Sequence, residues 1–280
     1  MGSSARSRYD EDMSSISRRR FVPAAAFAAM AGQARAVELR PATLRAFDDY
    51  IDKREHRLAL ERLNPGAAQF LWLDGRPERR SAAREGRVAI EAARKKNPIE
   101  APDGLIHDWV AGVFIPAATL ARVLARVQDY DQHKRFYAPE VMDSKLLRRQ
   151  GDRFHIYYRL MKKKVITAVL NSEHSVEYFS LGGGRAHSRS YSTKIAEVES
   201  PGERTEKELP PGGGHGFLWR LNSYWRFAER DGGVYVECEA VSLTRGIPFG
   251  LGWMVEPIIR DLPQESLEKT LSATRQAMRS

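Results

Sequence analysis

The side chains of this chain that can bind a metal or attack a substrate follow none of the spacings that such chemistry requires. There are seven histidines, at positions 56, 107, 133, 155, 174, 187 and 215, and they form no H-E-x-x-H or other ligand pattern. No G-x-S-x-G elbow occurs, and the glycine triplets 182–184 and 212–214 lack the Lys-Ser/Thr of a phosphate loop. We therefore predict no metal site, no catalytic set and no need for a cofactor.

The segment 185–192 alternates large polar residues with small ones. One set is Arg185, His187, Arg189 and Tyr191, and the other is Ala186, Ser188, Ser190 and Ser192. If the first set points into a pocket, its two arginines suit a carboxylate or a lipid headgroup. If the second set does, small side chains make room for a ligand. The simplest interpretation is an exposed polar face that balances Glu237 and Glu239.

An aromatic strand near the C-terminus indicates where a ligand would lie. Residues 217–243 form two alternating strands around Asp231-Gly232-Gly233, followed at 253–278 by a long helix that proline interrupts near Pro263. One face of the first strand carries Trp219, Leu221, Ser223, Trp225 and Phe227, and the other carries Arg220, Asn222, Tyr224 and Arg226. We expect the helix to cover the apolar face, because such a face must be buried.

The segment 153–160 repeats this alternation. Its apolar face carries Phe154, Ile156, Tyr158 and Leu160, and its polar face carries Arg153, His155, Tyr157 and Arg159. The two strands together predict a cavity between the sheet and the helix. The residues expected to line it are Phe154, Ile156, Tyr158, Arg189, Tyr191, Trp219, Leu221, Trp225, Phe227 and Trp253. In the alternative interpretation these side chains pack solidly and leave no space.

Composition and charge place the chain among ordinary globular proteins. It has 280 residues, of which 42% are hydrophobic and 29% charged, and a net charge of +9. Basic residues are scattered and do not interleave with exposed aromatics, so we predict no nucleic-acid site. The single cysteine, Cys238, lies in an alternating strand and is expected to be a small buried hydrophobe.

The first 36 residues have the pattern of a bacterial export signal. Ser17-Arg18-Arg19-Arg20-Phe21-Val22 precedes a short, weakly apolar run, which ends at the small-x-small site Ala34-Arg35-Ala36. The pair Arg18 and Arg19 resembles the twin-arginine signal, whose receptor reads the arginines directly. This resemblance implies the twin-arginine export machinery as a partner and a periplasmic or secreted location. Six arginines against three acids in this segment give +3, so the remainder carries +9 minus 3, or +6.

Between the leader and the last strands, the periodicity predicts an extension and then a regular meander. In residues 37–103 we expect a helix over Pro41–Leu63 and a short strand at Phe70–Leu73; Val88 and Ile90 fit either a strand or a helix. From residue 104 the pattern predicts a strand at 105–115, a helix from Leu120 to Val127, and strands at 141–149, 153–161, 165–179 and 185–198.

This order of elements resembles the START-like superfamily, also called the SRPBCC, helix-grip or Bet v 1-like fold, which includes polyketide cyclase/dehydrase-like proteins. The resemblance covers residues 104–278. It rests on Val113-Phe114-Ile115-Pro116, on Asp129-Tyr130 before Tyr137-Ala138-Pro139-Glu140-Val141, and on Tyr224-Trp225-Arg226-Phe227 before Ile247-Pro248-Phe249-Gly250. It implies an α+β fold in which an antiparallel sheet wraps around the long C-terminal helix, with a mainly helical N-terminal extension. The superfamily shares no catalytic set, so the resemblance assigns no catalytic residue.

These patterns leave three hypotheses. In the first, the chain is an exported protein that holds a hydrophobic small molecule or lipid between the sheet and the C-terminal helix. In the second, a cyclase or aromatase uses the same cavity, with Tyr158, His187 and Tyr191 as candidates for moving a proton. In the third, the protein works at a membrane surface through its basic face and its N-terminal extension.

Overall fold

Ten antiparallel strands form one sheet in the computed structural model. The structure describes residues 39–64, 69–163, 167–246 and 252–279; for residues 252–260 it describes the backbone and not the side chains. Along the sheet the strands run β1 (Ala89–Ala92), β3 (Gly104–Pro116), β10 (Gly233–Arg245), β9 (Arg220–Arg230), β7 (Arg185–Glu199), β6 (Thr167–Gly182), β5 (Arg153–Lys163) and β4 (Val141–Gln150). The short strands β2 (Ile99–Ala101) and β8 (Lys207–Glu208) pair with β3 and β7. Residues 36–280 form one compact unit.

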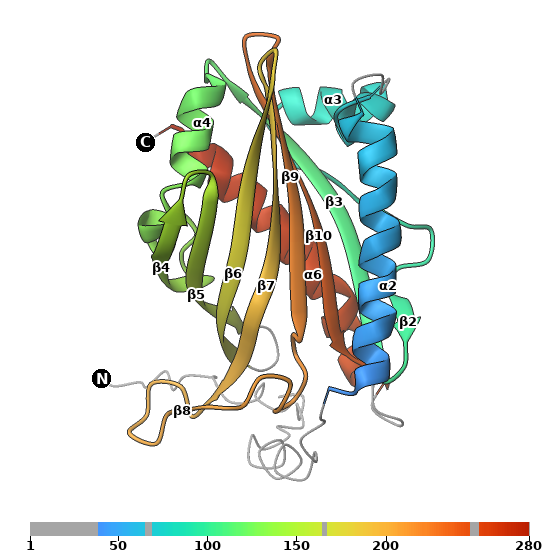
Figure 1. Cartoon of the computed structure of the whole chain (residues 1–280), viewed down its shortest axis with the longest axis vertical. Coiled ribbons are helices and arrows are strands. Elements are labelled where there is room, and N and C mark those ends of the chain that lie inside the picture. Colours follow the sequence, from blue (N-terminus) through green and yellow to red (C-terminus); the bar gives the residue numbers. More distant parts are fainter. Residues whose placement is uncertain (1–38, 65–68, 164–166, 247–251, 280) are drawn as a thin grey trace, which may run out of the picture. The chain divides into compact units, whose positions relative to one another are not determined.

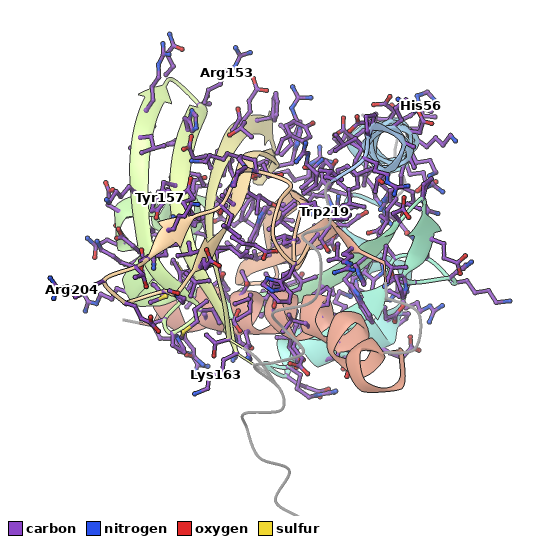
Figure 2. All side chains as sticks on the ribbon, turned by 90° about the horizontal axis from the view of Figure 1, so that it is seen from below. His56, Arg153, Tyr157, Lys163, Arg204 and Trp219 are labelled. Carbon is purple, nitrogen blue, oxygen red and sulfur yellow. The ribbon has the colours of Figure 1, made fainter. Side chains whose placement is uncertain are left out.

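Helices cover this sheet on both sides (Figure 1). α6 (Gly252–Ala277) crosses one side diagonally, together with α4 (Leu120–Val127) and α5 (His133–Phe136); α2 (Pro41–Leu58) and α3 (Pro77–Arg84) lie on the other side. Figure 2, seen from below, shows α2 end-on near His56 and α6 on the opposite side of the strands. We call these two sides the α6 face and the α2 face. No helix among the described residues is long and apolar enough to span a bilayer.

Alternation along the strands divides the core between the two faces. Val113 of β3, Val236 of β10 and Phe227 of β9 point toward α6 and pack with its Leu267 and Leu271. The α2 face has two clusters of its own. In one of them, Phe47 and Ile51 of α2 pack on Ile106, Tyr224, Val241 and Leu243. Residues 39–101 therefore pack on and extend the sheet that begins at β3.

The predicted α+β helix-grip architecture is confirmed: a large antiparallel sheet holds the C-terminal helix against one face. The strands expected at 105–115, 141–149, 153–161, 185–198 and on either side of Asp231-Gly232-Gly233 are all present. Ile90 lies in strand β1 (Ala89–Ala92), and Val88 directly precedes that strand.

Two local predictions were wrong. Residues 70–73 do not form a strand, because Trp72–Gly75 is a 3-10 turn whose Leu73 side chain fills the space over Gly112. The helix does not break at Pro263: α6 is continuous, since a proline removes one backbone hydrogen bond and neighbouring packing can hold the helix together. The helix expected over Pro41–Leu63 is present: it is α-helical to Leu58 and continues as a π-helical turn over Ala59–Leu63.

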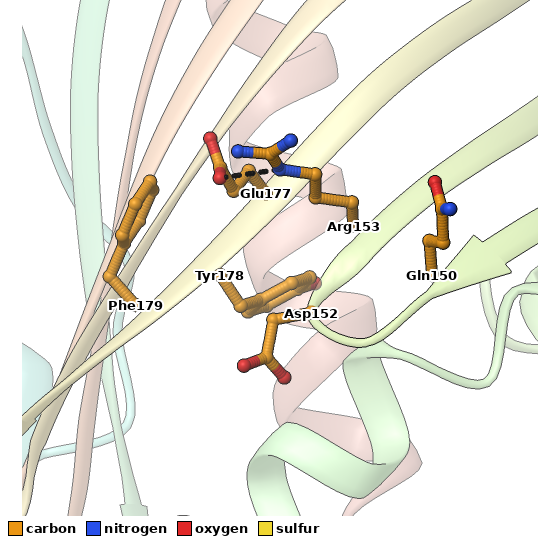
Figure 3. A pocket seen from close by; sticks show the side chains of 6 residues that line it. All are labelled: Gln150, Asp152, Arg153, Glu177, Tyr178 and Phe179. Carbon is orange, nitrogen blue, oxygen red and sulfur yellow. Dashed lines mark hydrogen bonds and ion pairs between the residues drawn. The ribbon is translucent and has the colours of Figure 1, made fainter.

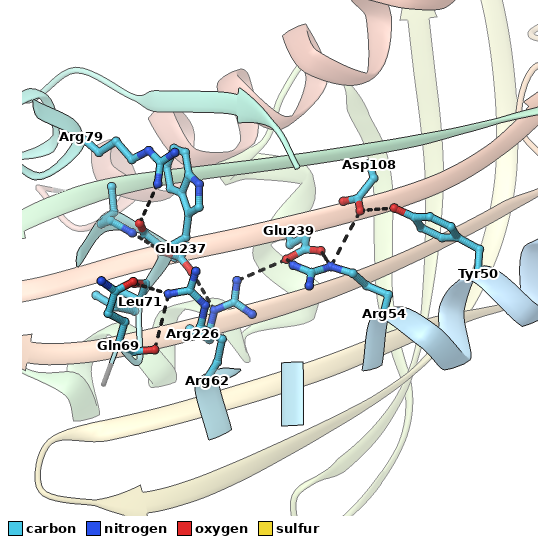
Figure 4. A network of polar contacts seen from close by, with 12 residues as sticks. Tyr50, Arg54, Arg62, Gln69, Leu71, Arg79, Asp108, Arg226, Glu237 and Glu239 are labelled. Atoms are coloured by element: carbon cyan, nitrogen blue, oxygen red, sulfur yellow. Dashed lines mark hydrogen bonds and ion pairs between the residues drawn. The ribbon is translucent and has the colours of Figure 1, made fainter. Parts of the chain in front are cut away.

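The polar side of β9 is buried beneath α2 and the segment that follows it. Arg226 donates a hydrogen bond to Glu237 at 2.7 Å and contacts Glu239 at 3.5 Å, and all three side chains lie beneath the N-terminal segment (Figure 4). Arg54 of α2 forms a bidentate ion pair with Glu239, and Tyr50 donates a hydrogen bond to Asp108 at 2.5 Å. The charged residues on one side of β9 give the strand an amphipathic pattern in the sequence. In the fold, ion pairs connect this side of the sheet to α2.

Candidate functional site

The α6 face of β9 keeps accessible surface although a helix crosses it. Leu221, Ser223 and Trp225 on this face are partly exposed, whereas Asn222, Tyr224 and Arg226 on the α2 face are only 6%, 5% and 3% exposed. The apolar side of the strand is thus the accessible one, and the polar side is sealed. Tyr158 and Leu160 of β5 are also partly exposed on the α6 face.

The candidate cavity residues do not all share one face. Phe154, Ile156 and Tyr158 of β5 lie on the α6 face with Leu221, Trp225 and Phe227 of β9, as the register through β6 and β7 requires. Arg189, Tyr191 and Trp219 lie on the α2 side. Trp253 belongs to the part of α6 whose side chains lie outside the described residues.

Trp219 departs from the alternation because β9 begins only at Arg220. It lies at a bend before the strand, is 2% exposed, and packs with Phe47 and Ile51 of α2. The sequence prediction extended the alternation of the strand to Trp219 and so placed it on the same face as Trp225. The bend before Arg220 ends that alternation, and Trp219 lies on the opposite face.

On β7, the set of small residues points toward α6. Ala186 and Ser188 are paired with Phe227 and Trp225 of β9 and share their face. Tyr191, on the other face, donates a hydrogen bond to Glu55 of α2 at 2.7 Å, and Arg189 pairs with Glu177 at 2.8 Å. Small side chains therefore make room on the α6 face, and the two arginines 185 and 189 do not point into it.

A group of hydroxyl and imidazole side chains lies on the α6 face beside these small residues. We call it the tyrosine–histidine cluster, and its members are Tyr130, His133, Tyr137, Tyr158, His174 and Tyr178. His133 Nδ1 lies 2.7 Å from the Tyr158 hydroxyl, and the Tyr130 and Tyr178 hydroxyls are 2.9 Å apart. The Tyr137 hydroxyl lies 3.1 Å from Thr274 Oγ1 of α6, so the cluster reaches from β5 and β6 to the C-terminal helix.

The segment between α4 and β4 positions the helical half of this cluster. Two hydrogen bonds from a backbone N–H to a side chain hold it against β4: the Leu146 N–H donates to Asp131 Oδ1 at 2.9 Å, and the Lys134 N–H donates to Ser144 Oγ at 2.8 Å. Tyr130 also packs against Phe154, with ring centroids 5.4 Å apart.

Burial keeps the members of the cluster uncharged at neutral pH. It lowers the pKa of His133 to about 4, outweighing smaller raising effects of the Val127 carbonyl and Asp131. It lowers the pKa of His174 to about 4 as well, with a further lowering effect from His155. Burial also raises the pKa of Tyr158 well above its usual range, and that of Tyr137 to about 12. The cluster is therefore polar and neutral.

Sequence reasoning found only Tyr158 of this cluster. Tyr130 and Tyr137 served as markers of the fold, and His133 was considered only as a metal ligand. His174 alternates with Ser172 and Val176 on β6, so the same period of two that placed Tyr158 was available for it. The contribution of His133 depends on the fold of a loop segment over the sheet, for which the sequence carries no periodic signal.

A hollow at the edge of the sheet adjoins the tyrosine–histidine cluster through Tyr178. A depression of about 390 Å³ is lined by Gln150, Asp152, Arg153, Glu177, Tyr178 and Phe179 at the turn between β4 and β5 (Figure 3). Its cation is already neutralised, because Arg153 donates a hydrogen bond to Glu177 at 2.8 Å. Among the described residues, no group of three or more His, Cys, Asp or Glu side chains is placed to hold a metal.

Comparison with known proteins finds likeness in structure alone. No protein-family profile and no curated protein matches the chain. A STAR-related lipid transfer protein from Xanthomonas axonopodis is 15% identical with a TM-score of 0.46, over 68% of this chain and 99% of that one. The Zhui aromatase/cyclase from Streptomyces sp. R1128 is 12% identical with a TM-score of 0.41, over 62% and 94%. The lipid transfer and protein localization domain of human StarD13 is 9% identical with a TM-score of 0.41, over 74% and 97%.

Proposed function

We propose that this chain is an exported protein that holds a hydrophobic small molecule or lipid on the α6 face of its sheet. The observation that carries the proposal is the partly exposed apolar surface of Leu221, Trp225 and Leu160 on the face that packs against α6, where β7 contributes mainly serine and alanine. Binding of an apolar molecule to this surface is favourable, because the molecule displaces water from it.

The size of the effect is adequate for binding. A molecule that buries about 300 Å² of apolar surface gains about 7 kcal/mol at 25 cal/mol per Å². Part of this gain is offset by the translational and rotational freedom lost on association. Hydrogen bonds to the tyrosine–histidine cluster would then fix the orientation of the molecule more than its affinity.

The chemistry of the cluster favours binding over acid–base catalysis. A general acid or base works best when its pKa lies near the working pH. His133, with a pKa of about 4, is a weak base, and Tyr158 holds its proton far above neutral pH. The other two residues of the cyclase hypothesis, His187 and Tyr191, lie on the α2 face and do not meet Tyr158.

Uptake of a neutral fluorescent probe, Nile red, tests the proposal. We expect the chain to bind it and the variant Ser223→Trp to lose affinity by about tenfold or more, because the new side chain fills the space beside Trp225. The matched control is Ser175→Trp, since Ser175 is exposed on the α2 side of β6. Equal binding by wild type and Ser223→Trp, or no uptake by the wild type, would refute the proposal.

Export is the second part of the proposal, and the leader sequence supports it. Residues 1–38 lie outside the described residues, so the twin-arginine pattern at Arg18 and Arg19 stands on sequence. A periplasmic location would bring the protein into the compartment between two membranes, where a carrier for apolar molecules has lipid on both sides.

A further inference from the structure

A segment rich in glycine and proline lies against one end of the α6 face. Residues 209–217 follow β8 and lead toward β9 at the lower end of the sheet in Figure 1, and we call them the strap. Between Pro210 and Gly216 the strap consists of proline, glycine and one exposed histidine, and Gly216 is the single buried residue among them. A segment with so few apolar contacts opens at a lower free energy than the strands around it.

A buried carboxylate holds the strap on this face. Glu197 of β7 is 5% exposed and lies on the α6 face, because it pairs with Leu170 of β6, which in turn pairs with Leu160 of β5. Its Oε2 accepts the backbone N–H of His215 at 2.7 Å and lies 3.1 Å from Nδ1 of the same residue. Its Oε1 accepts the backbone N–H of Phe217 at 2.9 Å. The strap therefore lies directly beside the apolar row that Leu160 and Leu170 form.

Among the described residues, Glu197 is the only side chain that hydrogen-bonds to the strap. The other ties are backbone hydrogen bonds, such as those from the Arg245 N–H to Gly216 at 2.8 Å and from the Leu39 N–H to Gly212 at 3.1 Å. Burial raises the pKa of Glu197, but its hydrogen bonds outweigh this effect and lower the pKa, so the group is a carboxylate at neutral pH. Hydrogen bonds to an ionised acceptor are stronger than those between neutral groups. This carboxylate is thus the main contact that keeps the strap in place.

The position of the strap also depends on a glycine. Gly214 has a φ of +83°, and a Cβ atom there would lie 2.5 Å from Glu197 Oε2. A side chain at this position would therefore push the strap away from the carboxylate. Gly202, in the loop between β7 and β8, has the same φ, but its Cβ position has nothing within 4 Å. Comparing alanine at these two positions separates the strain of a positive φ from the loss of the contact with Glu197.

We propose that the strap is a lid on the α6 face, which Glu197 holds closed and which moves away from β7 to let an apolar molecule enter and leave beside Leu160. The inference rests on the proposed function, because it specifies the entrance to that same site. Glu197 is a positioning residue here. Weakening a lid changes the rates of binding and dissociation, and it leaves the affinity unchanged when the closed state is destabilised equally with and without the ligand.

Stopped-flow fluorescence with Nile red measures both rates. We expect Glu197→Gln and Gly214→Ala each to raise the association and dissociation rate constants about tenfold, because each weakens hydrogen bonds to a charged acceptor, and to change Kd by less than about twofold. The control Gly202→Ala should leave both rate constants within about twofold of wild type. Hydrogen exchange followed by mass spectrometry should show faster exchange of residues 209–217 in the first two variants and not in the control.

The outcomes separate this inference from the proposed function. Unchanged Nile red rates in both variants, with or without faster exchange of the strap, would overturn the inference while the binding site stands. A weaker affinity at an unchanged association rate would also overturn it, since the strap would then be a wall of the site. If the wild type binds no Nile red, the proposed function fails and the lid fails with it. Should Glu197→Gln not fold, Gly214→Ala against Gly202→Ala decides the matter by itself.

Discussion

His174 is a buried, neutral imidazole whose ionisation links folding to pH. Its pKa is about 4 in the folded protein and near 6.5 when unfolded. Between these values the unfolded chain binds more protons than the folded one, so stability is lost as the pH falls from about 6.5 to 4. The difference corresponds to about 3 kcal/mol for this histidine. His133 acts in the same direction.

Replacing His174 by asparagine removes this contribution. We expect the difference in unfolding free energy between pH 7 and pH 4.5 to shrink by about 2 kcal/mol relative to wild type, measured by urea unfolding at each pH. The same change at His56, which is exposed on α2, controls for loss of an imidazole as such. An unchanged pH dependence in His174→Asn would contradict the burial of a neutral ring.

At the scale of single elements, the ion pairs between α2 and the sheet are the feature to test. Arg54 is 12% exposed and binds Glu239, which is fully buried. Burial favours the protonated form of Glu239, but Arg54 and Arg226 outweigh it and lower its pKa. Arg54→Met would remove one of the two arginines that pair with Glu239. We therefore expect the free energy of unfolding, measured in urea, to fall by about 3 kcal/mol. Lys53→Met, one residue earlier and exposed, should cost less than about 0.5 kcal/mol.

Asp108, which accepts a hydrogen bond from Tyr50 of α2, makes stability depend on pH in the opposite direction from the histidines. Burial, with a further contribution from Glu239, raises its pKa from 3.8 to about 7. The folded protein therefore keeps a proton that the unfolded chain releases, so the contribution of this carboxyl is complete below pH 4 and is lost as the pH rises toward 7.

Asp108→Asn keeps an oxygen that accepts the Tyr50 hydrogen bond but removes the ionisation. We expect the variant to gain stability relative to wild type as the pH rises from 4 to 8. Thermal unfolding across this range measures the stability of the variant minus that of wild type, and a difference that falls with rising pH would contradict the raised pKa.

The strands and the C-terminal helix were predictable because each carries its own periodic signal. Phe154, Ile156 and Tyr158 alternate with polar residues, and Leu221, Trp225 and Phe227 do the same, so one local rule places both sets. The burial of the opposite face was not predictable in this way. Arg54 meets Glu239 across 185 residues, and before that contact is known a buried arginine looks like an exposed one.

At the scale of the whole molecule, the proposed export signal would determine where the carrier works. Changing Arg18 and Arg19 together to lysine keeps the positive charge and removes the guanidinium pair that the export receptor reads, so we expect the protein to stay in the cytoplasm. Cell fractionation followed by immunoblotting measures this, with Arg6→Lys and Arg8→Lys as the matched control pair. Periplasmic protein from the lysine variant would contradict the twin-arginine assignment.

Native mass spectrometry of the protein, purified without detergent from a bacterial host, tests the binding of an apolar molecule most directly. The account predicts a mass above that of the polypeptide by one small apolar molecule, which is released on denaturation and absent from Ser223→Trp. A mass equal to the polypeptide alone, in a folded protein that also takes up no Nile red, would contradict it.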